Sequence, residues 1–130
     1  MMLYKETTNR ILNAAFEVHK HLGCGFLESV YEEALSREFE FQQIPYERQK
    51  TLKVFYKETP IKDFVIDFLV DQTVIVEIKA IQNYTDTEIA QVINYLKASK
   101  YEVGLLLNFG ASSLQYKRLI CSKYKNLESV

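Results

Sequence analysis

The stretch from Val74 to Phe109 constrains the fold more than any other part of this 130-residue chain. VIVEIKA (74–80) and VGLLLNF (103–109) are largely apolar on both alternating faces, which is typical of strands buried on both sides of a sheet. Between them, over 86–100, apolar residues recur every three or four positions, as in an amphipathic helix. The order strand, helix, strand predicts a right-handed crossover between two parallel strands of one sheet.

Further elements are expected on both sides of this unit. Periodicity predicts helices over 5–22 and 27–43 and strands over 51–56 and 64–70. Glycines at 23–25 separate the helices, a turn is expected at 57–60, and 112–124 fits a short helix or a strand. The order ααβββαβ indicates an α/β fold, with a mixed sheet of about four strands flanked by helices.

Length and composition limit the class of protein. No linker or repeat divides the chain, so residues 1–130 are expected to form one domain. A formal charge of −1 gives no support for nucleic-acid binding through bulk charge. Cys24 and Cys121 match neither a zinc spacing nor a disulfide framework. Because no signal peptide or membrane-spanning run is found, we expect a cytoplasmic protein without membrane contact.

Charged residues interrupt the buried strands, although such residues are rarely buried without a partner. Asp67 lies inside one strand, and Glu77 and Lys79 lie two positions apart, hence on one face, in the next. A divalent cation such as Mg²⁺, which prefers oxygen ligands, would compensate two facing carboxylates, with Lys79 assisting. The alternative, commoner in an arbitrary sheet, is an Asp67–Glu77–Lys79 ion-pair cluster.

The turn between these strands decides whether the two acids meet. A three-residue turn over 71–73 pairs Val70 with Val74 and places Asp67 opposite Glu77, whereas a two-residue turn puts the acids on opposite faces. The Asp-Gln sequence lacks the positive-φ preference of two-residue hairpin turns. We therefore expect an odd-length turn or an equivalent bulge.

Two helices offer further polar side chains. Glu28, one turn before Tyr31, lies at the margin of the buried face of its helix and can reach the site, or it complements the helix N-terminus. Gln91 and Tyr95 are stacked four positions apart on the crossover helix. They can orient Lys79 or hold a phosphate; the alternative is an exposed amide and a tyrosine at the core margin.

These residues together resemble a known family. Asp67, Glu77-Ile78-Lys79 and Gln91-x-x-x-Tyr95 resemble the PD-(D/E)xK nuclease superfamily, in its recombination-type exonuclease branch. The resemblance implies a restriction-endonuclease-like core that acts on nucleic acid. It implies that Asp67 and Glu77 bind Mg²⁺ or Mn²⁺ with the Ile78 carbonyl as an extra ligand. Lys79 would then position or activate the attacking water.

A second resemblance covers the N-terminal part. EVHKHLGCGFLESVYEEAL looks like the GxxExxY protein family, through Gly25, Glu28 and Tyr31. It implies that Glu28 is the helical acid near the metal, while Gln91 and Tyr95 support Lys79 and the substrate backbone. That family is biochemically undefined, so the fold follows more directly than the function.

Other positions are less constrained. Ile66 stands where the superfamily pattern has proline, and Glu88 stands where relatives often carry histidine, which puts a catalytic role there in doubt. His19, with Tyr31, is a candidate for supporting the substrate near Glu28; the alternative is a favourable interaction with the helix dipole.

The preferred hypothesis is a metal-dependent nuclease acting on DNA, with RNA as the second option. The alternatives are a catalytically silent nuclease-fold module that binds nucleic acid or a protein, and a structural protein with an ion-pair network. The basic segment KRLICSKYK (117–125) can contact phosphates, although a solvated face is the commoner explanation. Because the chain is small, a homodimer or an accessory protein would help it to hold a duplex.

Overall fold

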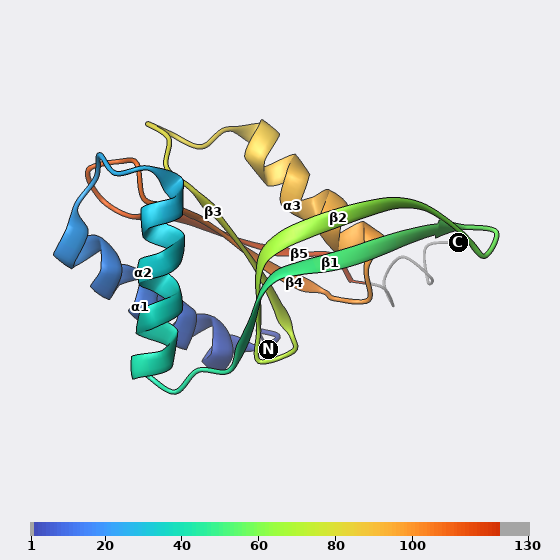
Figure 1. Ribbon diagram of the computed structural model, residues 1–130, viewed down its shortest axis with the longest axis horizontal. Coiled ribbons are helices and arrows are strands. Elements are labelled where there is room, and N and C mark those ends of the chain that lie inside the picture. Colours follow the sequence, from blue (N-terminus) through green and yellow to red (C-terminus); the bar gives the residue numbers. More distant parts are fainter. Residues whose placement is uncertain (1, 123–130) are drawn as a thin grey trace.

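The computed structural model describes residues 2–122 (Figure 1). The elements, in chain order, are α1 (Lys5–Leu22), α2 (Glu28–Phe41), β1 (Tyr46–Tyr56), β2 (Thr59–Val70), β3 (Val74–Lys79), α3 (Asp86–Ala98), β4 (Val103–Asn108) and β5 (Gln115–Ile120). The strands form one sheet in the order β1-β2-β3-β4-β5. The β3–β4 pair is parallel, as predicted for the crossover, and the other pairs are antiparallel.

Two hydrophobic cores cover the two faces of the sheet, which explains the apolar character of both faces of β3 and β4. The α1/α2 core joins these helices to strand residues such as Phe68, Val76 and Ile78. The α3 core joins α3 to the opposite face, for example to Leu69 and Ile75. The fold class is therefore α/β, with helices on both sides of a mixed sheet.

The sheet has five strands rather than the predicted four. The fifth, β5, lies within the segment whose pattern was weak, and residues 123 and 124 of that segment lie outside the described residues. As an edge strand it leaves Tyr116 and Ile120 exposed, while Leu119 packs into the α3 core. Its apolar residues therefore do not alternate cleanly.

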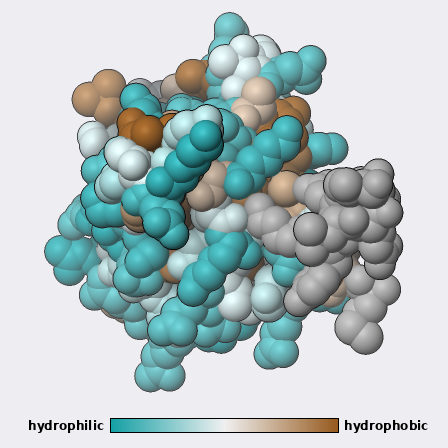
Figure 2. Space-filling model, turned by 90° about the vertical axis from the view of Figure 1, so that its right-hand side faces the viewer, coloured by the Kyte–Doolittle hydropathy of each residue, from teal (hydrophilic) through white to brown (hydrophobic). Residues whose placement is uncertain are grey.

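The hairpin of β1 and β2 is longer than predicted, because β1 begins at Tyr46 rather than at 51 and β2 at Thr59 rather than at 64. These extensions are largely exposed, so they carry polar residues that resemble a loop in sequence. Figure 1 shows the hairpin reaching beyond the body of the molecule. From that end the surface is mainly hydrophilic with scattered apolar side chains (Figure 2).

The turn between β2 and β3 spans residues 71–73, the predicted odd length, and has the predicted register. Val70 pairs with Val74, as required to bring the two acids together. Yet Asp71 and Gln72 both adopt the left-handed conformation, with φ of 52° and 58°, and Thr73 N donates to Val70 O at 3.0 Å. The expectation that Asp-Gln avoids positive φ was wrong, while the register derived from the apolar pairing is confirmed.

Candidate active site

The site lies where β2 and β3 separate. Their ladder ends at the Phe68–Val76 pair, and beyond it side chains replace the backbone partners. The Glu77 carboxyl accepts a hydrogen bond from Asp67 N at 2.7 Å, and the Asp67 carboxyl accepts one from Ile78 N at 2.8 Å. The two acids thus lie across the opening of the sheet, each held by the other strand's backbone.

Glu77 is the most strongly perturbed titratable group in the described part of the chain. Its side chain is on the α3 face, since its neighbours Val76 and Ile78 pack into the α1/α2 core. The residue is 5% exposed. Burial first, and the negative charge of Asp67 second, raise its pKa to about 9. Without a cation, the Asp67–Glu77 pair therefore holds a proton at neutral pH.

Two charged residues complete the electrostatics at this end of the sheet. Glu28 is the first residue of α2; partial burial first, and the Asp67 charge second, raise its pKa. Lys79, half-buried at the end of β3, opposes these effects by lowering the pKa values of Glu28 and Glu77. The structure thus brings Glu28 and Lys79 within electrostatic range of the two facing acids.

The crossover helix adds an amide and a phenol. Tyr95 interacts through its hydroxyl with Gln91 and with Glu77. Its pKa is raised by burial first and then by the charges of Glu77 and Asp67. The capping box of Thr85 and Glu88 starts this helix. Glu88 therefore has a structural partner of its own.

Tyr31 and His19 are both buried and have partners within the protein. Tyr31 is fully buried, donates from its hydroxyl to Gly23 O at 2.6 Å and stacks on Phe109 with centroids 4.9 Å apart. His19 Nε2 lies 3.0 Å from Ala111 O, and its ring also stacks on Phe109. Both side chains hold the loops around the helix pair together.

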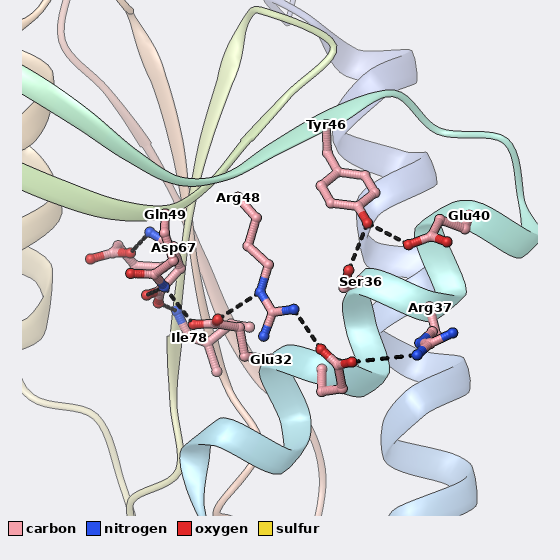
Figure 3. A network of polar contacts seen from close by, with 11 residues as sticks. Glu32, Ser36, Arg37, Glu40, Tyr46, Arg48, Gln49, Asp67 and Ile78 are labelled. Atoms are coloured by element: carbon pink, nitrogen blue, oxygen red, sulfur yellow. Dashed lines mark hydrogen bonds and ion pairs between the residues drawn. The ribbon is translucent and has the colours of Figure 1, made fainter.

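Residues that the sequence reasoning missed surround Asp67 (Figure 3). Gln49 of β1 donates from Nε2 to Glu32 Oε1 at 2.8 Å and to Asp67 Oδ1 at 3.4 Å. Arg48 Nε donates to Glu32 Oε2 at 2.8 Å and its guanidinium also reaches Glu33. Polarity alone gave no signal, because Arg48 and Gln49 lie in an apparently loop-like run and Glu32 is one of several acids on its helix.

The side chains at this site include oxygen donors for a metal ion. Within residues 2–122, no three Asp, Glu, His or Cys side chains converge closely enough to hold a metal by themselves. Asp67 and Glu77 do converge, and the Ile78 carbonyl, next to Glu77 in the chain, is the candidate for a third oxygen donor. Oxygen donors suit Mg²⁺ or Mn²⁺, and Mg²⁺ commonly keeps waters beside one or two carboxylates. The residues present therefore fit such an ion.

Comparison with known proteins decides the family. A family model described as the PD-(D/E)XK nuclease superfamily matches residues 5–119. The chain belongs to the PD-(D/E)XK nuclease superfamily. Among solved structures, it is similar to an alkaline exonuclease (LHK-Exo) from Laribacter hongkongensis, at 13% identity, covering 98% of this chain and 76% of that chain with a TM-score of 0.45. A search of curated proteins gave no match.

Membership in the PD-(D/E)XK superfamily confirms the broader of the two resemblances drawn from the sequence. The chain departs from the superfamily name at Ile66, which precedes Asp67 in place of proline. Ile66 lies within β2 and is fully buried in the α3 core. No helix among residues 2–122 is long and apolar enough to cross a membrane.

Proposed function

We propose that this protein is a metal-dependent nuclease that hydrolyses phosphodiester bonds in DNA, with RNA as the second candidate substrate. The observation that carries the proposal is the facing pair of Asp67 and Glu77, whose electrostatic neighbours include Lys79. The chain belongs to a nuclease superfamily, and this membership also supports phosphodiester hydrolysis.

Asp67, Glu77 and the Ile78 carbonyl are proposed to hold Mg²⁺ or Mn²⁺, with Glu28 as a nearby further acid. A bound ion of this kind polarises the phosphate, lowers the pKa of water and stabilises the leaving oxygen. Glu77 must release its proton to become a ligand, which is unfavourable in its buried position without a cation. Ion binding and the ionisation of Glu77 are therefore coupled in this proposal.

Lys79 is proposed to hold the attacking water or a phosphate oxygen. The positive charge of its ammonium lowers the pKa values of Glu28 and Glu77, so this charge lies close to the two acids. In this proposal it stabilises the negative charge that develops during hydrolysis. Tyr95, which interacts with both Gln91 and Glu77, is proposed to keep Glu77 in place. Gln91 is exposed and is proposed to contact the substrate backbone.

The finer assignment to the GxxExxY family is also a proposal. Gly25 has φ of 110°, a conformation that favours glycine, and lies in the loop before α2. The Tyr31 hydroxyl accepts from Phe26 N at 3.3 Å and donates to Gly23 O, which ties this loop to the helix. A glycine, an acid and a tyrosine at this spacing thus build the loop that presents Glu28. His19 is proposed to support the same region.

A catalytically silent binding module is the second candidate. The formal charge of −1 favours it, because a duplex-binding surface is usually basic. Such a module would bind nucleic acid or a protein and would cleave no substrate with any metal.

Cleavage assays test the proposal. Single-stranded DNA, duplex DNA and RNA are incubated with Mg²⁺, Mn²⁺ or a chelator, using the parent protein, Lys79→Ala and the exposed control Lys20→Ala. We expect metal-dependent cleavage by the parent and by Lys20→Ala, with a loss of roughly a hundredfold or more in Lys79→Ala. Equal cleavage by all three proteins, or none by the parent under any condition, contradicts the proposal.

A further inference from the structure

Gln49 has the most informative backbone conformation in the sheet. Its φ of 54° lies in the left-handed region, although it is not glycine and lies in the middle of β1. Such a conformation costs free energy and persists where the surrounding structure imposes it, often at functional sites. In the β1–β2 ladder, Arg48 pairs with Phe68 and Lys50 pairs with Ile66. Gln49 and Asp67, which lie between these pairs, are not paired with each other in the ladder.

The side chains of β2 change from one face of the sheet to the other at Asp67. Ile66 packs into the α3 core, whereas Phe68, two positions on, packs into the α1/α2 core. Two residues at this spacing share a face in a regular strand, so β2 is irregular at Asp67. The irregularity coincides with the hydrogen bond from Asp67 N to Glu77, which a regular strand pair would not make. The distortion and the facing acids belong to one arrangement.

The side chain of Gln49 contacts two acids at this irregular step. Its amide nitrogen donates to Glu32 Oε1 at 2.8 Å and, more weakly, to Asp67 Oδ1 at 3.4 Å (Figure 3). Asp67 Oδ2 accepts from Ile78 N, so both oxygens of this carboxylate have a donor. Arg48 holds the other oxygen of Glu32. One neutral amide therefore joins an acid of α2 to the acid of β2.

We propose that Gln49 is a positioning residue that fixes the orientation of Asp67 for metal binding; this inference rests on the proposed function. An amide donates two hydrogen bonds without adding charge, so it holds two carboxylates without neutralising the negative charge that attracts a cation. A lysine would cancel that charge, and a glutamate would repel both acids. Groups that orient metal ligands commonly affect metal affinity by roughly 10- to 100-fold.

A purely structural role for Gln49, linking α2 to β1, makes a different prediction. Glycine adopts positive φ without strain, so Gln49→Gly relieves the backbone while it removes the amide. Gln43→Gly is a matched control, because Gln43 is also an exposed glutamine in the left-handed conformation, with φ of 57°, but it follows the C-terminal end of α2. Both variants relieve the same kind of strain, and only Gln49→Gly removes a donor from Asp67.

The experiment measures Mn²⁺ binding by isothermal titration calorimetry and the midpoint of thermal unfolding for the full chain and both variants. We expect Gln49→Gly to bind Mn²⁺ roughly tenfold or more weakly than the parent, with an unfolding midpoint that is not lowered. Gln43→Gly should bind Mn²⁺ as the parent does. In cleavage assays, Gln49→Gly should need a correspondingly higher Mn²⁺ concentration for half-maximal rate.

Equal Mn²⁺ affinity in the parent and Gln49→Gly overturns the proposal, as does a parent that binds no Mn²⁺. Weaker binding only in proportion to a lowered unfolding midpoint also overturns it, since that result indicates a structural link. A parent that binds Mn²⁺ but cleaves no nucleic acid contradicts the proposed function alone, because the calorimetric comparison still decides the role of Gln49.

Discussion

At the scale of single residues, the buried acid Glu77 makes the stability of the metal-free protein depend on pH. Its folded-state pKa is raised from the ordinary 4.5 to about 9, chiefly by burial and then by Asp67. Between these values the folded state holds a proton that the unfolded state has released. The free energy of unfolding should therefore fall as pH rises through this window, by up to about 1.4 kcal/mol per pH unit from this group.

Glu77→Gln isolates this contribution, because the amide has similar shape and does not titrate. Urea unfolding with a chelator present, measured from pH 5 to 9, should show a smaller loss of stability with rising pH in Glu77→Gln than in the parent. The difference between the two proteins cancels the titration of unrelated groups. Parallel curves for the two proteins would mean that Glu77 ionises in the folded state at an ordinary pH.

At the scale of elements, the close approach of α3 to β4 packs Tyr95 against the sheet. Gly104 of β4 permits this approach, because a Cβ there would lie 2.7 Å from the Val92 Cγ1 atom. Val92 is buried and β-branched, so it has little freedom to move away. Gly104→Ala should destabilise the fold by about 1–3 kcal/mol through overpacking, as measured by urea unfolding.

The double variant Gly104→Ala/Val92→Ala tests the cause of this loss. If the clash with Val92 is responsible, the double variant should be more stable than the sum of the two single changes predicts, since removal of the Cγ atoms makes room for the new methyl group. Strictly additive effects would show that Gly104 is required for another reason, such as backbone conformation.

How much of each element the sequence predicts depends on burial. The helices and β3–β4 are recognisable because they bury a regular face, and the Val70–Val74 register follows from the same apolar pairing. By contrast, the outer parts of the β1–β2 hairpin and the edge strand β5 are exposed and carry no regular pattern.

The same contrast holds within the site. Asp67, Glu77 and Lys79 are visible in the sequence because they interrupt apolar strands. Gln49 and Glu32 are not, because each is one polar residue among others. Their pairing depends on a left-handed residue within a strand, a conformation that local sequence preference does not indicate for glutamine. Only the three-dimensional arrangement shows that they adjoin Asp67.

At the scale of the whole molecule, the site lies between the two hydrophobic cores, at the end of the β2–β3 ladder. The two cores on opposite faces hold the sheet, while the acids lie where β2 leaves β3 to run into the hairpin. The hairpin tip has exposed apolar side chains, Phe55, Tyr56 and Ile61, on a mainly hydrophilic surface. The opening of the sheet thus accommodates the polar side chains of the site without disrupting either core.

The overall charge limits how this molecule can hold a nucleic acid. With 16 basic and 17 acidic residues, the molecule does not attract phosphates through its net charge. Binding should release few counterions, so the logarithm of the binding constant should fall with the logarithm of salt concentration with a slope of roughly −3 or shallower. Fluorescence anisotropy measures this slope over 50 to 300 mM salt in the presence of Mn²⁺. The Lys79→Ala variant is used because its expected loss of cleavage allows binding to be measured alone.

Omission of Mn²⁺ from the same titration supplies the control. Because the acids at the site repel phosphate, binding should weaken further when the cation is absent and should recover when it is restored. A steep slope that is independent of Mn²⁺ would instead indicate a basic surface remote from Asp67 and Glu77, and the substrate would then be held by the periphery of the molecule rather than by its metal site.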